Sequence, residues 1–312
     1  MSNPPFKAGS VALLGAPNAG KSTLLNQVLG QKVSIVSPKP QTTRNRVAGI
    51  YNSPQMQVVV VDTPGIHDAD RAKSPLNRTL VAVAESALTE VDVLCWVVDA
   101  LRAAERAEGE RALIVGVIDD IAARLSALPQ PLIIALNKVD RAEKPWILPV
   151  IAALHERLPQ AEIVPISALR GDGVEALLQT WGQHLPEGEP SYPTDQLLLE
   201  PERFVVAEFV REQIFRLTEQ EIPYATAVEI EKCDEAERES ERPEVEIYAR
   251  IIVERDSQKG ILIGRGGQML KQIGMRARRD IEGLLGAHVY LHLHVAVERD
   301  WSRDPRYLRR LS

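Results

Sequence analysis

The chain has 312 residues, of which 45% are hydrophobic and 26% charged, and its formal net charge is −6. These proportions exclude a disordered or fibrous chain, and the negative charge excludes uniform coating of nucleic acid. No apolar run approaches the roughly 18 residues that cross a bilayer, and the N-terminus lacks a signal-peptide pattern. The length fits two domains, and we expect a cytoplasmic, monomeric protein.

Short apolar runs alternate with helical patterns between residues 10 and 182. The runs read SVALLG, VVVVDTP, VDVLCWVVDA, PLIIALNKVD and EIVPISA, and they are rich in Val, Ile and Leu. Runs of this kind, separated by helices, indicate a mostly parallel sheet that is covered on both faces. We therefore predict an α/β domain over residues 1–184.

The first glycine-rich turn follows the predicted strand VALLG and precedes a helical pattern. Residues 15–22 read GAPNAGKS and match the P-loop pattern G-x-x-x-x-G-K-[ST] in the strand–helix context that it requires. Backbone N–H groups of such a turn surround phosphates, the lysine adds positive charge, and the serine hydroxyl can bind Mg²⁺. The predicted phosphate-binding residues are Gly15, Ala16, Pro17, Asn18, Ala19, Gly20, Lys21, Ser22 and Thr23.

Two further segments complete the phosphate side of this site. The motif DTPG ends a buried strand, where Asp62 can join the Mg²⁺ shell and the Gly65 N–H can bind the γ-phosphate. The polar segment PKPQTTRNR, residues 38–46, carries two threonines, and we favour Thr43 over Thr42 as the one that reaches Mg²⁺ when γ-phosphate is present. DTPG adds Asp62, Thr63, Pro64 and Gly65 to the site, and the predicted magnesium ligands are Ser22, Thr43 and Asp62.

Two motifs predict that the base is guanine. NKVD, residues 137–140, follows a buried strand, and the Asp140 carboxylate can accept from the N1–H and 2-amino groups that guanine has and adenine lacks. A mismatch of that kind can be worth about 10⁴-fold in discrimination. SAL, residues 167–169, ends another strand, where the Ala168 N–H can donate to guanine O6. The base side therefore comprises Asn137, Lys138, Asp140, Ser167, Ala168 and Leu169.

The second half of the chain has a different pattern. Residues 185–200 begin with LPEGEPSYPTDQ, whose prolines, glycine and acidic residues indicate a linker. A helix, two strands, a helix–loop–helix and a last strand follow, an α-β-β-α-α-β order. We predict an α+β domain over residues 201–312.

The second glycine turn, GRGG at residues 264–267, lacks G-K-[ST] and follows a helical pattern, so we expect no second nucleotide there. It matches the G-x-x-G loop of KH domains, whose short side chains let a nucleic-acid backbone come close. Residues 244–312 hold 13 basic and 9 acidic side chains, against 6 and 13 in residues 200–243. Contacts from such a basic surface would set affinity rather than sequence choice. The predicted RNA contacts are Ile263, Gly264, Arg265, Gly266, Gly267, Lys271, Arg276, Arg278 and Arg279; a glycine turn between packed helices with solvated arginines is the alternative.

The four nucleotide motifs in this order, with KPQTTR and GILIGRGGQMLKQIG, closely resemble the Era family of bacterial GTPases over essentially the whole chain. The resemblance implies a P-loop GTPase domain and a type II KH domain. It also implies a GTP-hydrolysing switch that binds near the 3′ end of 16S ribosomal RNA during 30S subunit assembly. The alternatives are a signalling switch whose C-terminal domain binds a protein or membrane, and a tRNA-modifying GTPase, whose expected cofactor or cysteine site the sequence lacks. The basic tail, residues 299–312, could extend the RNA surface or touch anionic lipid, so peripheral contact with the inner membrane face stays open.

The resemblance also bears on hydrolysis. Ile66 follows DTPG, where Ras-type GTPases carry a water-orienting glutamine, and we interpret the adjacent His67 as a bystander. In related GTPases an asparagine at the Asn18 position accompanies a bound K⁺, so we predict K⁺ stimulation in addition to Mg²⁺. Electrostatic stabilisation then supplies most of the rate, and the predicted catalytic residues are Asn18, Lys21, Thr43 and Gly65.

Overall fold

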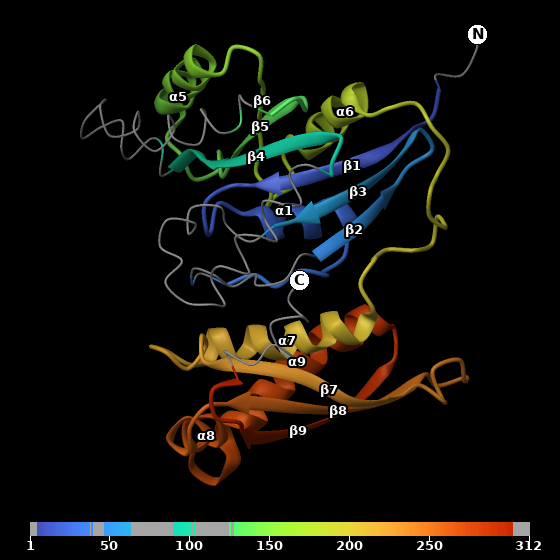
Figure 1. Cartoon of the computed structure of the whole chain (residues 1–312), viewed down its shortest axis with the longest axis vertical. Coiled ribbons are helices and arrows are strands. Elements are labelled where there is room, and N and C mark those ends of the chain that lie inside the picture. The colour runs from blue at the N-terminus through green and yellow to red at the C-terminus, as the bar shows by residue number, and fades with distance from the viewer. Residues whose placement is uncertain are drawn as a thin grey trace.

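The computed structural model describes residues 5–37, 39, 47–63, 90–101, 103, 125 and 128–301. Within these ranges a six-stranded sheet forms the N-terminal part of the molecule, and a three-stranded sheet forms the C-terminal part below it (Figure 1). In the part of the chain so described, no helix is both long and apolar enough to span a membrane.

The first sheet has the strand order β2-β3-β1-β4-β5-β6. Among the strand pairs that the structure describes in this sheet, only β2–β3 is antiparallel. Side chains of β1 alternate between two hydrophobic clusters, one that includes residues of helices α1 and α6 and one that includes residues of α5. A sheet covered on both faces is what the apolar runs predict, and the α/β fold class is confirmed. The strands are β1 (Lys7–Leu14), β2 (Val47–Asn52), β3 (Met56–Asp62), β4 (Val93–Asp99), β5 (Leu132–Asn137) and β6 (Glu162–Pro165), and the helices are α1 (Lys21–Leu29), α5 (Lys144–Arg157) and α6 (Val174–His184).

The parallel strands place chemistry at one edge of this sheet. β1, β3, β4 and β5 are parallel, so their carboxyl ends meet at the same edge, the usual place for a ligand site in an open α/β sheet. Asp62, Asp99 and Asn137 are the last residues of three of these strands.

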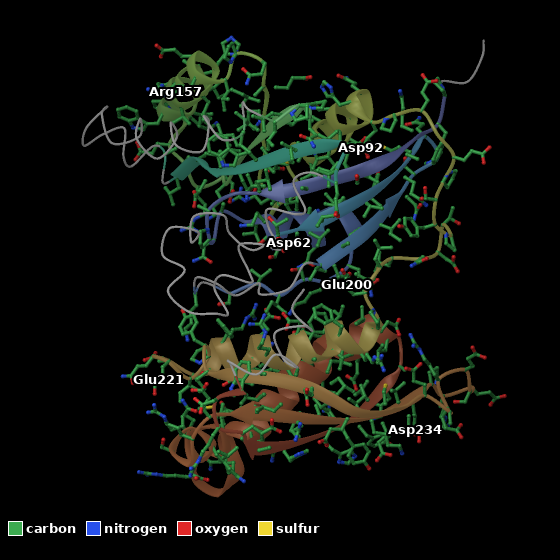
Figure 2. The ribbon with its side chains drawn as sticks, viewed as in Figure 1. Asp62, Asp92, Arg157, Glu200, Glu221 and Asp234 are labelled. Atoms are coloured by element: carbon green, nitrogen blue, oxygen red, sulfur yellow. The ribbon has the colours of Figure 1, made fainter. Side chains whose placement is uncertain are left out.

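The predicted linker is fixed to the sheet. Residues 185–200 lie between α6 and α7 (Glu202–Leu217). The Ile50 N–H donates to Leu197 O at 2.8 Å, and the Leu199 N–H donates to Ala48 O at 3.0 Å. The segment thereby covers the open edge of β2, and Figure 2 shows Glu200 between the two sheets. The domain boundaries at residues 184 and 201 remain predictions.

The second domain has the predicted α-β-β-α-α-β order and a three-stranded sheet in the order β7-β8-β9. β8 pairs antiparallel with β7 and parallel with β9. Helix α9 buries Ile273, Ala277, Ile281 and Leu285, a four-residue spacing that keeps its charged residues on the other side. The remaining elements are β7 (Thr226–Asp234), β8 (Glu244–Val253), α8 (Asp256–Ile263), α9 (Gln268–Leu285) and β9 (His288–Val297).

Candidate functional site

The first glycine turn joins β1 to α1 in a conformation that requires glycine. Gly15 has φ +145° and Gly20 has φ +104°. A Cβ atom at Gly15 would lie 2.4 Å from the Val97 carbonyl oxygen, and one at Gly20 would lie 2.2 Å from Asn137 Nδ2. The turn therefore packs directly on β4 and on the NKVD motif.

Lys21 is the first residue of α1 and is only 7% exposed. Its Nζ donates to the carbonyl oxygens of Gly15 at 2.9 Å and Ala16 at 3.1 Å. Burial lowers the pKa of Lys21, and the Asp62 carboxylate opposes that shift. A phosphate anion at this helix N-terminus would stabilise the ammonium form, so the geometry suits an anionic ligand.

Asp62 ends β3 and is fully buried, and Figure 2 marks its place in the upper domain. Its Oδ2 accepts hydrogen bonds from Ser22 Oγ at 2.6 Å and Ser34 Oγ at 3.0 Å, whereas Oδ1 has no hydrogen-bond partner among the described residues. Burial raises the pKa of Asp62, while Lys21 and the two hydroxyls oppose that rise. A buried carboxylate oxygen without a donor, beside a serine hydroxyl, fits the hard oxygen ligands that Mg²⁺ prefers. The adjacent Thr63 hydroxyl donates to Leu13 O at 2.8 Å and joins β3 to β1.

Asn137 connects three loops on the base side. It is 2% exposed; its Nδ2 donates to Ala19 O at 2.8 Å, and its Oδ1 accepts from the N–H groups of Lys138 at 2.8 Å and Ala168 at 2.9 Å. The Ala168 N–H is the donor that we predict for guanine O6, and that role remains a prediction. The P-loop, NKVD and SAL are thus held in one arrangement.

Two charged pairs flank the base loop. Lys138, with φ +67°, donates from Nζ to Asp99 Oδ2 and to Asn18 O, both at 2.6 Å. The Asp140 carboxylate is 6% exposed, and its Oδ2 lies 3.5 Å from the Nε of exposed Arg170. Sequence reasoning missed Asp99 and Arg170, although Asp99 stands at the carboxyl end of an apolar strand, where ligand sites concentrate.

The second glycine turn differs from the first. Gly264, Gly266 and Gly267 have φ +71°, +58° and +77°, and Cβ atoms added at Gly266 and Gly267 would meet nothing within 4 Å. The turn joins α8 to α9, and Arg265 in it is exposed. Its outer side is thus open to a backbone that approaches closely. The basic side chains on α9 that we predict to bind RNA are also exposed, namely Lys271, Arg276, Arg278 and Arg279, while Ile263 is partly buried.

Comparison with known proteins relates both domains of the chain to one family. Residues 10–138 match the family described as 50S ribosome-binding GTPase, and residues 221–302 match the KH domain. The chain is 49% identical to GTPase Era of Geobacter metallireducens, over 100% of this chain and 99% of that protein. It is 45% identical to GTPase Era of Lactobacillus delbrueckii subsp. bulgaricus, over 97% and 95% of the two chains. The chain belongs to the Era family of GTPases.

Two solved Era structures cover nearly the whole chain. An Era variant of Aquifex aeolicus bound to GDP and AlF4⁻ has a TM-score of 0.85 and 40% identity, over 98% of this chain and 99% of that one. Era in complex with MgGDPNP and nucleotides 1506–1542 of 16S ribosomal RNA has a TM-score of 0.86 and 41% identity, with the same coverage. This Era-family chain is therefore a GTPase that carries a KH domain.

The structure brings most of the predicted nucleotide residues of this Era-family chain together at one edge of the sheet. Several residues with predicted roles lie outside the described residues, namely Thr42, Thr43, Pro64, Gly65, Ile66 and His67. Leu169, a predicted contact, is 74% exposed. Pro17 lies in the P-loop, and Thr23 lies in the first turn of helix α1. Ser167 is buried next to Ala168, whose N–H donates to Asn137.

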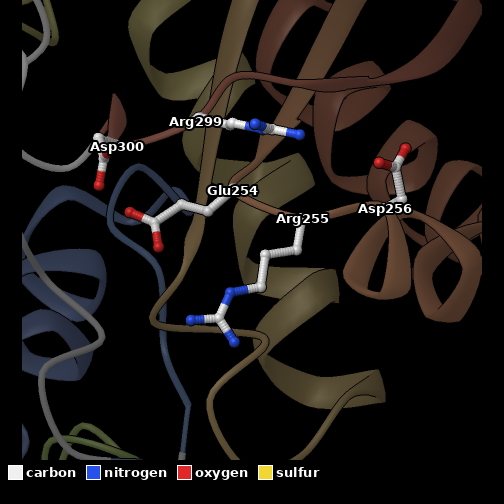
Figure 3. Close-up of a pocket in the computed structure, with 5 residues that line it drawn as sticks. All are labelled: Glu254, Arg255, Asp256, Arg299 and Asp300. Atoms are coloured by element: carbon white, nitrogen blue, oxygen red, sulfur yellow. The ribbon is translucent and has the colours of Figure 1, made fainter.

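A separate pocket lies in the KH domain, between the end of β8 and the residues after β9 (Figure 3). It has a volume of about 360 Å³ and is lined by Glu254, Arg255, Asp256, Arg299 and Asp300. The charges of these three acidic and two basic side chains nearly cancel, so the pocket has no clear preference for an anion such as phosphate.

Proposed function

We propose that this Era-family protein is a GTP-hydrolysing switch that binds 16S ribosomal RNA near its 3′ end through its KH domain and assists 30S subunit assembly. The observation that carries the proposal is the open turn at Gly266 and Gly267, next to exposed Arg265, in a chain that also holds the buried nucleotide site. The related Era that binds nucleotides 1506–1542 with MgGDPNP supports this choice of RNA. The basic surface beside the turn favours RNA over the signalling alternative.

The geometry supports hydrolysis by electrostatic stabilisation. Mg²⁺, when bound, would supply positive charge to the phosphate oxygens. Lys21 holds a second charge at the start of α1, where a helix N-terminus favours an anion. Asp62, Ser22 and Thr43 would hold the metal, and the Gly65 N–H would bind the γ-phosphate.

A short segment supports coupling between the two domains. The connecting segment, residues 31–36, leaves α1 and leads toward Thr43. Lys32 Nζ lies 2.5 Å from Glu212 Oε2 on α7 and 2.6 Å from Asp280 Oδ2 on α9. Arg216 donates to Val36 O at 3.0 Å. Because the same segment contacts Asp62 through Ser34, a rearrangement at the nucleotide would be transmitted to the KH helices.

The test measures GTP hydrolysis and RNA binding together. An RNA that corresponds to nucleotides 1506–1542 is added to the protein loaded with GDPNP or GDP, and hydrolysis is followed with and without the RNA. We expect tighter binding with GDPNP and faster hydrolysis with RNA. Gly266→Asp should lower RNA affinity about tenfold and leave hydrolysis without RNA unchanged, because aspartate tolerates this backbone conformation but repels phosphate.

Gly286→Asp is the matched control, since Gly286 is another exposed glycine of this domain with φ +63° and open space around it. It should leave RNA affinity unchanged. If RNA fails to bind in either nucleotide state, the KH proposal is wrong, and vesicles with anionic lipid then test the membrane alternative.

Three finer parts of the proposal have separate tests. Asn18 in the P-loop supports K⁺ stimulation, so hydrolysis should be faster in KCl than in NaCl at equal ionic strength. Sedimentation should give a monomer. Peripheral membrane contact would appear as co-sedimentation with anionic vesicles that high salt reverses.

A further inference from the structure

The connecting segment places a second hydroxyl on the Asp62 carboxylate. Ser34 is 1% exposed, and its Oγ donates to the same Oδ2 that accepts from Ser22. Ser22 comes from α1 and Ser34 from a loop, so the two donors approach from different elements. Among the described residues, Oδ1 receives no hydrogen bond.

Two donors on one oxygen restrict how the carboxylate can turn. The terminal torsion of an aspartate has a broad, shallow preference, so a single contact at Oδ2 leaves the carboxylate free to swing about it. A second donor fixes its plane, and the direction of Oδ1 is then fixed as well. Groups that orient ligands in this way commonly change metal affinity by about 10- to 100-fold when they are removed.

Asn26 holds Ser34 in place. Its Oδ1 accepts from the N–H groups of Val33 and Ser34, each at 2.8 Å, and its Nδ2 donates to Ser34 O at 2.8 Å. Asn26 lies on α1 one turn after Ser22, on the same side of the helix. Helix α1 therefore sets both hydroxyls on Asp62, Ser22 directly and Ser34 through Asn26.

We propose that Ser34 is a positioning residue of the magnesium site, whose hydroxyl keeps Asp62 Oδ1 available to the metal ion or to one of its water ligands. The proposal rests on the magnesium site described above. It adds to that site a residue outside the four nucleotide motifs.

The test measures how Mg²⁺ slows the release of N-methylanthraniloyl-GDP from the full-length protein. For Ser34→Ala, the Mg²⁺ concentration that gives half of the slowing should rise about tenfold, while release in EDTA changes less than twofold. Asn26→Ala should shift the Mg²⁺ dependence in the same direction, and it serves as the second variant if Ser34→Ala is poorly folded. Ser10→Ala is the matched control: it removes a hydroxyl bonded to Asp92 at 2.9 Å, which Figure 2 places away from Asp62, and should change neither value.

The outcomes distinguish a Ser34 that positions Asp62 for the metal ion from a Ser34 that only stabilises the loop. Equal acceleration in EDTA and in Mg²⁺ would show that Ser34 only supports the loop, and an unchanged Mg²⁺ dependence would show that Asp62 needs no second donor. Either result overturns the proposal. If Mg²⁺ fails to slow release even from the unmodified protein, the magnesium site itself is wrong, which is a separate failure.

Discussion

The two glycine turns of this protein use the same residue for different physical reasons. In the P-loop, Gly20 is needed because its backbone packs against Asn137, and a Cβ atom would have no room. In the KH turn, Gly266 and Gly267 have empty space around them; glycine suits their positive φ, and its lack of a side chain leaves the turn open to access from outside. A glycine-rich loop thus indicates close approach, but only its surroundings reveal whether the neighbour is the protein itself or a ligand.

Gly20→Ala should have the largest effect, because it combines strain at φ +104° with displacement of the Asn137 amide that joins three loops. We expect GDP affinity to fall about 100-fold, equivalent to about 3 kcal/mol, with a lower melting temperature. Titration with fluorescent GDP and a thermal melt measure both. The counterpart Gly267→Ala, strained at φ +77° but unobstructed, should cost only about 1 kcal/mol of stability and leave GDP affinity unchanged. Equal losses of GDP affinity would contradict the distinction between the two turns.

Lys32→Ala removes one of the charged side chains that connect the two domains. Glu212 is fully buried, and burial raises its pKa while Lys32 and Arg216 oppose the rise. Without Lys32, the pKa of Glu212 in the folded protein should rise further above its unfolded value of about 4.3. Below that pH Glu212 is protonated in both states and stability is retained, whereas stability is lost as the pH rises through the folded pKa. We expect a loss of about 2 kcal/mol at neutral pH, since Arg216 still pairs with Glu212, and a smaller loss at pH 5.

Urea unfolding at the two pH values measures this difference. Lys7→Ala is the control, because the Lys7–Glu187 pair is at the surface with a 3.7 Å separation and should contribute less than about 1 kcal/mol. A deficit for Lys32→Ala that shrinks as pH rises would contradict the proposed role of Glu212.

The sequence predicts those features whose signal is local. The strand–turn–helix context of Lys21, the position of Asp140 after a buried strand and the order of elements around Gly264 could all be predicted, because each depends on neighbouring residues. Arg170 and Ser34 could not, since their partners lie 30 and 28 positions away along the chain. The place of Asp99 at the end of an apolar strand is a local signal, but its pairing with Lys138, 39 positions away, is not. The composition of residues 185–200 likewise predicts a linker but not its hydrogen bonds to β2, because those depend on which sheet edge is open.

Arg279→Glu tests whether the basic surface beside the KH turn binds RNA. It reverses one exposed charge on α9, and we expect RNA affinity to fall about tenfold and the slope of log affinity against log salt to decrease by about one. Filter binding at several salt concentrations measures both quantities. Arg242→Glu, an equal change of charge at an exposed position between β7 and β8, should have a much smaller effect. Equal effects of the two variants would mean that net charge, rather than a surface beside the turn, attracts RNA.

Arg170→Ala should have the smallest effect, and in the opposite direction. The Arg170 side chain is 64% exposed, and its Nε lies 3.5 Å from the Asp140 oxygen that is expected to accept from guanine. Exposed ion pairs contribute about 0–1 kcal/mol, so removing this competitor should raise GDP affinity about threefold at low salt. At 1 M salt the difference should vanish, because screening removes the competing pair in both proteins. A fall in affinity at low salt would instead mean that Arg170 holds Asp140 in its binding conformation, so that the preorganised part of the nucleotide site would reach from the buried P-loop to an exposed side chain.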